Sequence, residues 1–105
     1  MTIQNEVLSA IAARRSCRAY LPEQIKPEEL QAVLEAGTWA PTGMNRQSPI
    51  IVVVQDKETR DKLSAMNAAV MGNNGDPFYG APTVLVVLAD RNMSTHVEDG
   101  SLVLG

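Results

Sequence analysis

The stretch "IIVVVQ" at residues 50–55 is a run of β-branched residues that lies between a proline and an aspartate. Such a run predicts a buried β-strand. A second apolar stretch, "TVLVVLAD" at residues 83–90, predicts another buried strand. Between them, residues 56–71 have helical spacing, and Asp56 stands where it can cap the helix. The centre of the chain therefore predicts strand, helix and strand, an order that by itself suggests a parallel β-α-β unit.

Helical patterns flank this centre on both sides. Residues 3–13 place apolar side chains at helical spacing, and "KPEELQAVLEAG" at 26–37 carries a proline suited to the first helical position. The last residues, 94–105, begin another helix whose apolar side chains run up to Gly105 without a capping signal. We therefore expect residues 1–105 to be a single domain that is truncated at its C-terminal side. An intact mass of the natural product equal to 105 residues would contradict this expectation.

One polar side chain interrupts the apolar face of the central helix. Leu63, Met66 and Val70 form a helical stripe, and Asn67 lies on the same face, so we expect Asn67 to point inward. A buried amide needs hydrogen-bond partners. The backbone or a cofactor can supply them.

Composition limits the kind of protein. The chain has 105 residues, a net charge of -3 and 45% hydrophobic residues, which is enough for one core. Its one cysteine and one histidine make a metal centre improbable. No basic surface indicates nucleic-acid binding, and no apolar run is long enough to span a bilayer. We expect a cytoplasmic protein without nucleic-acid or membrane partners.

Against this acidic background, "RRSCRAY" at residues 14–20 concentrates three arginines. Arg14 and Arg15 can simply complement the dipole at the end of the first helix. Alternatively, guanidinium groups bind phosphate or carboxylate oxygens in pairs, and Ser16 can add a donor. The chain contains no glycine-rich phosphate loop, so a nucleotide phosphate would have to be held by side chains.

The stretch "TWAPTGMNRQSP" at residues 38–49 predicts a structured loop or a short linker, because its prolines, glycine and polar residues exclude both helix and strand over most of the segment. The amides of Asn45 and Gln47 carry a donor and an acceptor together, which suits the edge of a ring with alternating N–H and C=O groups. Trp39 and Met44 are interpreted as core anchors.

Three segments together resemble the nitroreductase family of FMN-dependent oxidoreductases: "ARRSCRAY" at 13–20, "AGTWAPTGMNRQSP" at 36–49 and "FYGAPTVLVVLAD" at 78–90. The first two are similar to that family's R-R-S-x-R and A-P-S/T-x-x-N-x-Q-P signatures. The resemblance implies an α+β fold in α/β/α layers, with a mixed, largely antiparallel sheet flanked by helices. It also implies an intertwined homodimer with FMN at the subunit interface.

The resemblance also implies roles for particular residues. The arginine-rich stretch would hold the FMN phosphate, and the loop at 41–47 would reach the flavin bound to the other subunit. The flavin would carry the chemistry, so no side chain is expected to be catalytic. The phosphate would be held by Arg14, Arg15 and Ser16, and Arg18 would approach the ribityl chain and the pyrimidine side of the flavin. The flavin of the other subunit would be reached by Pro41, Thr42, Gly43, Met44 and Asn45. Gln47 would shape that loop, and Asn67 would form a hydrogen bond to the flavin edge.

The implied activity is hydride transfer from NAD(P)H through flavin N5 to a nitroaromatic, quinone or similar electron-poor acceptor, by a ping-pong mechanism. Related reactions of the family fragment flavin or dehalogenate aromatics. A different class of function remains open: a non-catalytic homodimeric interaction module of the same fold that binds a phosphate-bearing ligand through Arg14, Arg15 and Arg18.

Overall fold

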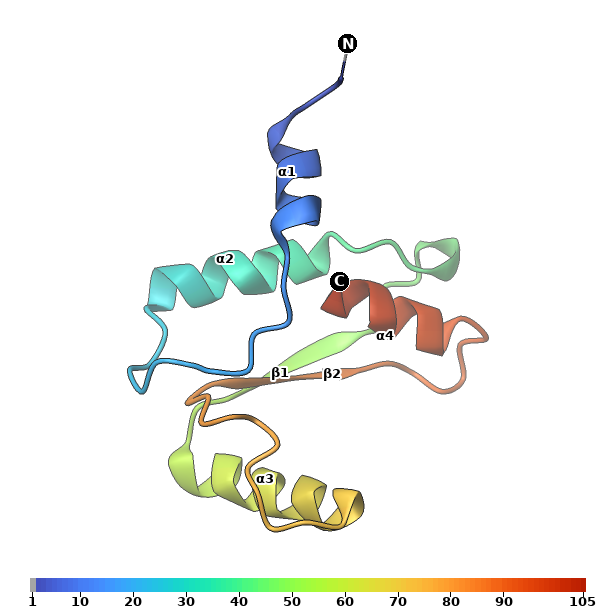
Figure 1. The fold of residues 1–105 in the computed structure, drawn as a ribbon. Helices are drawn as coiled ribbons and strands as arrows, with labels where there is room; N and C mark the ends of the chain where they lie inside the picture. The colour runs from blue at the N-terminus through green and yellow to red at the C-terminus, as the bar shows by residue number, and fades with distance from the viewer. Residues whose placement is uncertain (1) are drawn as a thin grey trace.

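The computed structural model describes residues 2–105 and places helices on both sides of a pair of strands (Figure 1). Helices α2 and α4 lie on one side of the sheet and α3 on the other, while α1 projects away from these layers. The α/β/α arrangement expected from the resemblance is confirmed. The elements are α1 (Glu6–Ala13), α2 (Pro27–Thr38), the 3-10 turn η1 (Gly43–Asn45), β1 (Ile50–Val54), α3 (Lys57–Met71), β2 (Val84–Leu88) and α4 (His96–Leu104).

The two strands pair antiparallel, with Val52 opposite Val86 at the centre of the register. The first residue of β2, Val84, pairs with the last residue of β1, Val54. Helix α3 and the loop after it therefore return the chain to the end of the sheet that it had just left. The parallel β-α-β unit is wrong, because a parallel crossover would have to carry the chain back to the other end. The antiparallel pairing that the resemblance implied is confirmed.

Side-chain caps define where two of the helices begin. The Asp56 carboxylate accepts a hydrogen bond from the backbone N–H of Thr59 at 3.0 Å, as the sequence predicted for α3. At α1, the Asn5 side chain accepts from the N–H of Leu8 at 2.9 Å. The first helix therefore starts three residues later than its apolar spacing indicated, because Asn5 is a cap and not a helical residue.

The core is small for a chain of this size. Among residues 2–105, only Val54 and Ala68 are buried hydrophobic residues, and two of the five residues of β1 are exposed. The solvent-accessible surface is 8467 Å², about 1.5 times the roughly 5700 Å² of a compact monomer of this mass. The prediction of fully buried strands is therefore wrong in this chain alone. Among the helices of residues 2–105, none has the length and apolar character of a membrane span.

The face of α3 that packs is not the one that its apolar stripe indicated. Ser64 and Ala68 are buried, whereas Met66 and Val70 are 66% and 87% exposed. Asn67 is exposed too, so the prediction of a buried amide is wrong in this chain. The physical reason is the loop at 72–82, which contacts this face of α3: the Ser64 hydroxyl donates to Asp76 at 2.8 Å, and the Ala68 carbonyl accepts from the N–H of Asn73 at 3.0 Å. Asn67 instead lines a shallow cavity of about 480 Å³ between α3 and β2.

Candidate functional site

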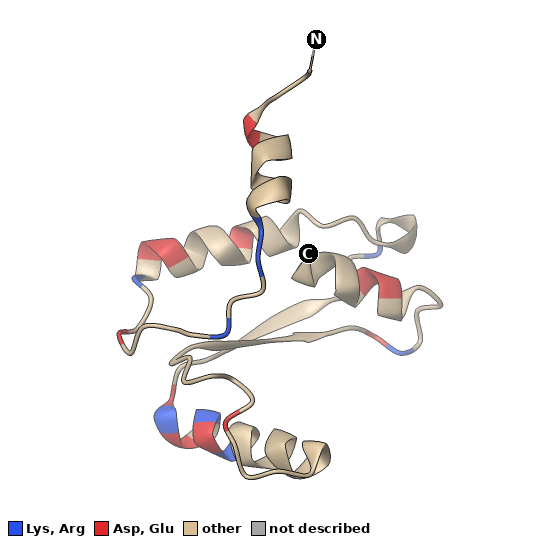
Figure 2. Ribbon diagram, in the orientation of Figure 1, with Lys and Arg blue, Asp and Glu red and all other residues tan. Residues whose placement is uncertain are grey.

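The arginine segment, residues 14–20, leaves α1 as exposed, extended chain (Figure 2). Arg15 donates from Nη1 to the carbonyl oxygens of Ala12 at 2.9 Å and of Arg14 at 2.8 Å. These bonds satisfy carbonyl groups at the C-terminal end of α1, which is the role that the dipole interpretation gave to Arg15. Arg14 and Arg18 make no side-chain hydrogen bond within residues 2–105.

No carboxylate of the described chain neutralises this segment. All ion pairs found in residues 2–105 lie on α3 and the loop after it, which leaves the three guanidinium groups of the segment without an acidic partner. They are Lys57–Asp61, Arg60–Asp61, Arg60–Asp76 and Lys62–Glu58. A cluster of exposed, uncompensated guanidinium groups in an acidic chain is a donor set that fits a phosphate group.

The loop at 41–47, which we call the amide loop, has an unusual backbone. Met44, Asn45 and Gln47 each have a backbone φ of 55°, which lies in the left-handed region that residues other than glycine rarely adopt. Three such residues within four positions store conformational strain, which persists only where the surroundings fix the backbone. The sequence predicted a structured loop here, and the geometry is consistent with one.

Hydrogen bonds inside the amide loop set the directions of its two amide side chains. The Thr42 hydroxyl accepts from the N–H of Gln47 at 3.0 Å, and the Thr42 carbonyl accepts from the N–H of Asn45 at 3.0 Å. The Gln47 Nε2 donates to Asn45 Oδ1 at 2.9 Å. Within residues 2–105 this leaves Asn45 Nδ2 as a donor and Gln47 Oε1 as an acceptor, a complementary pair for a heterocycle edge.

The two large side chains near the amide loop are not core anchors. Trp39 is 80% exposed and Met44 is 85% exposed. The core interpretation is wrong because Trp39 lies at the end of α2 and Met44 on the outward turn of η1. At the far end of the loop, Ser48 Oγ is the one buried side-chain oxygen or nitrogen in residues 2–105 that has no hydrogen-bond partner.

One copy of the described chain does not bring all the predicted site residues together. The arginine segment leads to the start of α2, the amide loop follows the end of α2, and Asn67 lies on α3 across the sheet (Figure 1). Within residues 2–105, no hydrogen bond or ion pair joins these three places.

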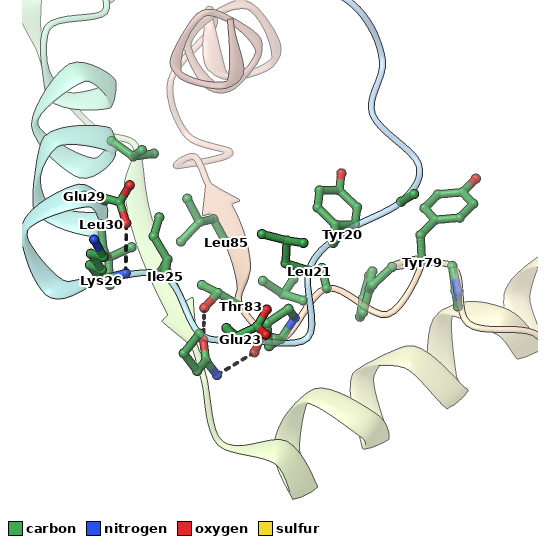
Figure 3. Close-up of a pocket in the computed structure, with 18 residues that line it drawn as sticks. Tyr20, Leu21, Glu23, Ile25, Lys26, Glu29, Leu30, Tyr79, Thr83 and Leu85 are labelled. Carbon is green, nitrogen blue, oxygen red and sulfur yellow. Dashed lines mark hydrogen bonds between the residues drawn. The ribbon is translucent and has the colours of Figure 1, made fainter.

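A groove of about 1040 Å³ begins at the end of the arginine segment, where Ala19 and Tyr20 line it (Figure 3). Tyr20, Leu21, Ile25 and Leu85 point into this space from the chain before α2 and from β2. None of the three arginines of the segment lines it. The groove is therefore a mainly apolar surface that the three guanidinium groups do not line.

Sequence reasoning missed a buried carboxylate that contacts the amide loop. Asp99 of α4 is 2% exposed and accepts a hydrogen bond from the backbone N–H of Gly43 at 2.9 Å. An aspartate in the first turn of a helix is typical of a dipole partner at the surface, so the sequence held no signal for its burial.

The chain is similar to known proteins over most of its length. A family model described as "Nitroreductase family" matches residues 11–101. A Bacillus subtilis protein named FMN reductase [NAD(P)H] is 35% identical over 89 residues. A crystal structure of a nitroreductase with bound FMN from Desulfitobacterium hafniense is 34% identical with a TM-score of 0.85, and one from Bacteroides fragilis is 29% identical with a TM-score of 0.84.

The matches cover most of this chain but a smaller share of each relative. The match spans 84% of this chain but 33% of the Bacillus subtilis protein. The two FMN-bound structures are covered to 62% and 60%, while 97% and 95% of this chain is matched. The chain therefore spans a third to about three fifths of the length of these relatives.

Proposed function

Because the chain belongs to the nitroreductase family, we propose that its protein is an FMN-dependent NAD(P)H oxidoreductase that reduces nitroaromatic, quinone or similar electron-poor acceptors by a ping-pong mechanism. The observation that carries the proposal is the arginine segment. Its three guanidinium groups are exposed and have no acidic partner within residues 2–105, although the chain has a net charge of -3. An anion such as a phosphate group is a partner that fits such a cluster.

Arg14, Arg15 and Ser16 would hold the FMN phosphate. Each guanidinium offers a planar fork of N–H donors, and the Ser16 hydroxyl adds another donor. Arg15 would donate to the phosphate from the N–H groups that its bonds to Ala12 and Arg14 leave free, since those bonds use Nη1 alone.

The amide loop would bind the ring of FMN held by a second copy. Pro41, Thr42, Gly43, Met44 and Asn45 form the part of the loop that we expect to reach that ring, and Gln47 fixes the Asn45 amide. The amide loop and the arginine segment are separated by the whole of α2 (Figure 1), and this separation supports a site shared by two subunits. So does the large solvent-accessible surface, because a homodimer would cover part of it. Asn67, exposed on α3, stays a proposed contact to the flavin edge.

When bound, FMN would take a hydride from NAD(P)H and pass the electrons on to the acceptor. The chain itself supplies position and charge. Arg18 would place a fixed cation beside the pyrimidine side of the flavin, where negative charge develops on reduction.

We expect Arg18→Ala to lower the reduction potential of the bound flavin and to slow its reduction by NAD(P)H. The charge of Arg18 favours the reduced state, so its loss shifts the equilibrium toward the oxidised state. The potential is measured by titration against reference dyes. Lys62→Ala removes the same charge from an exposed position on α3 and should leave the potential unchanged. Equal potentials in wild type and Arg18→Ala would refute the role.

The test of the proposed function is the visible absorbance of the full-length gene product, before and after FMN is added and the excess removed by gel filtration. We expect a flavin band that stays with the protein and is bleached by NADH or NADPH without oxygen. A colourless protein would overturn the proposal. Retention of inorganic phosphate by that colourless protein would favour the interaction module that uses the same arginines.

A further inference from the structure

A buried carboxylate in α4 contacts the amide loop from outside. Asp99 is 2% exposed, and it is the only charged residue buried among residues 2–105. Its Oδ1 accepts from the backbone N–H of Gly43 at 2.9 Å, and its Oδ2 accepts from the Thr95 hydroxyl at 2.9 Å. Burial of a carboxylate is unfavourable unless hydrogen bonds compensate it. Both oxygens of Asp99 are used in this way, and one of the bonds crosses 56 positions of sequence.

The same junction is closed by a tight steric contact. A Cβ atom at Gly43 would lie 2.3 Å from Thr95 Oγ1 and 2.8 Å from Thr95 Cγ2. Thr95 cannot move aside freely, because its hydroxyl is bonded to Asp99. The start of α4 therefore accepts only a glycine at this point of the loop, with its N–H directed at the carboxylate.

The junction stands directly before the strained part of the amide loop. Gly43 is followed by Met44 and Asn45, both left-handed, and then by Gln47, also left-handed. The loop's other polar bonds to oxygen or nitrogen join Thr42, Gly43, Asn45, Arg46 and Gln47 to one another. Such bonds fix the shape of the loop but not its place on the protein. Within the described chain, two hydrogen bonds tie the loop to residues outside it: the Gly43 N–H donates to Asp99 at 2.9 Å, and Arg46 Nη1 makes a weaker bond to Met93 Sδ at 3.8 Å.

We propose that Asp99 is a positioning residue for FMN, which acts through the Gly43 N–H to hold the amide loop where Asn45 and Gln47 meet the flavin ring. The inference rests on the proposed function, since it needs a flavin at the loop. Thr95 takes part by donating to the second carboxylate oxygen and by filling the space beside Gly43. No proton or electron passes through either residue.

The test compares variants of the full-length protein that keep or remove the acceptor. Asp99→Leu is similar in size but leaves the Gly43 N–H unpaired, and we expect the Kd for FMN to rise by about 10- to 100-fold. Asp99→Asn keeps Oδ1 as the acceptor, and its new N–H₂ can donate to the Thr95 hydroxyl. We expect Asn to hold the Kd within about threefold of wild type. Thr95→Val removes the hydroxyl and should weaken the binding of FMN, whereas Thr95→Ser keeps the hydroxyl and should bind FMN more tightly than Thr95→Val.

A second readout does not depend on the flavin. In the apoprotein, hydrogen exchange at the Gly43 amide should accelerate at least about tenfold in Asp99→Leu and stay near wild type in Asp99→Asn. Asp56→Ala is the matched control, because it removes a capping carboxylate of α3 that lies outside the loop. We expect that variant to lose stability while its Kd for FMN and its Gly43 exchange are unchanged.

The outcomes separate the two hypotheses. If wild type binds no FMN, the proposed function fails, and the exchange of Gly43 shows only whether Asp99 holds the loop. If wild type binds FMN and Asp99→Leu binds it equally well with slow Gly43 exchange, the positioning role is wrong. Equal losses of affinity in Asp99→Leu and Asp56→Ala would also overturn it, since both would reflect stability. If Asp99→Leu does not fold, an affinity for FMN in Thr95→Val equal to that of wild type would likewise refute the positioning role.

Discussion

Replacing Arg14 and Arg15 together by alanine should raise the Kd of the full-length protein for FMN by about 10²- to 10⁴-fold, because each charge-assisted bond to phosphate contributes about 1.5–3 kcal/mol. The Kd is measured by fluorescence quenching of the flavin. Affinity for FMN in the wild type should also fall with added salt, since ions screen the attraction between the arginines and the phosphate.

Riboflavin, which lacks the phosphate, is the matched ligand for this prediction. The double variant should bind riboflavin as well as wild type does, so the loss is confined to the ligand that carries the phosphate. Arg15 also bonds the Ala12 carbonyl at the end of α1, and its removal has a second, structural effect of less than about 1 kcal/mol. An equal loss of affinity for both ligands would show that the arginines act through the fold alone.

Asp76→Ala should lower the free energy of unfolding by about 3 kcal/mol, because it leaves several partners of one carboxylate unsatisfied at once. Asp76 accepts from Arg60 Nη2 at 2.5 Å, from the buried Ser64 hydroxyl at 2.8 Å, and from the N–H groups of Phe78 and Gly80. Arg60 is nearly buried and also lies over the Phe78 ring. The Asp76 carboxylate thus fixes the loop at 72–82 onto α3.

The control for this prediction is Asp61→Ala. Asp61 pairs with Lys57 on an exposed part of α3 and also contacts Arg60. Exposed pairs contribute little, so we expect a loss below about 1 kcal/mol. Both variants are compared with wild type by urea unfolding of the apoprotein. A loss in Asp76→Ala no larger than that in Asp61→Ala would contradict the role of the Asp76 network.

The Asp76 network also predicts a pH dependence. Burial opposes ionisation of Asp76, but hydrogen bonds from Arg60, Ser64 and two backbone amides outweigh it and hold the pKa of Asp76 well below its usual range. A carboxylate with a lowered folded-state pKa stabilises the fold above its unfolded pKa of about 3.9, and this stability is lost as the pH falls further. The difference in unfolding free energy between wild type and Asp76→Ala should therefore be constant near pH 6 and shrink below about pH 4.

The positions of the helices and strands could be predicted because local signals determine them. The Asp56 cap and the β-branched run of β1 are properties of a few neighbouring residues. Strand direction is different, since the same strand, helix and strand order allows either pairing. The antiparallel direction was predicted only through the resemblance. Val54 at the end of β1 pairs with Val84 at the start of β2, and the local pattern contains no information about which strand ends meet.

Burial and the long-range contacts of the candidate site could not be predicted in this way. An apolar stripe such as Met66 and Val70 indicates a face that some surface will cover, but the pattern does not say which surface. The bond from Gly43 to Asp99 joins residues 56 positions apart, and neither residue is unusual in its local sequence. The unpaired arginines, by contrast, were visible in the sequence because they stand out against an acidic chain.

Helix α1 has eight residues, none of them buried. A helix this short is marginal in water unless packing supports it. If a second copy covers α1 in the proposed homodimer, the arginine segment that follows is ordered by the same contact. Cofactor capture and subunit association then share one free energy of coupling, and thermodynamic reciprocity requires that FMN tighten the dimer by the same factor by which the dimer tightens FMN.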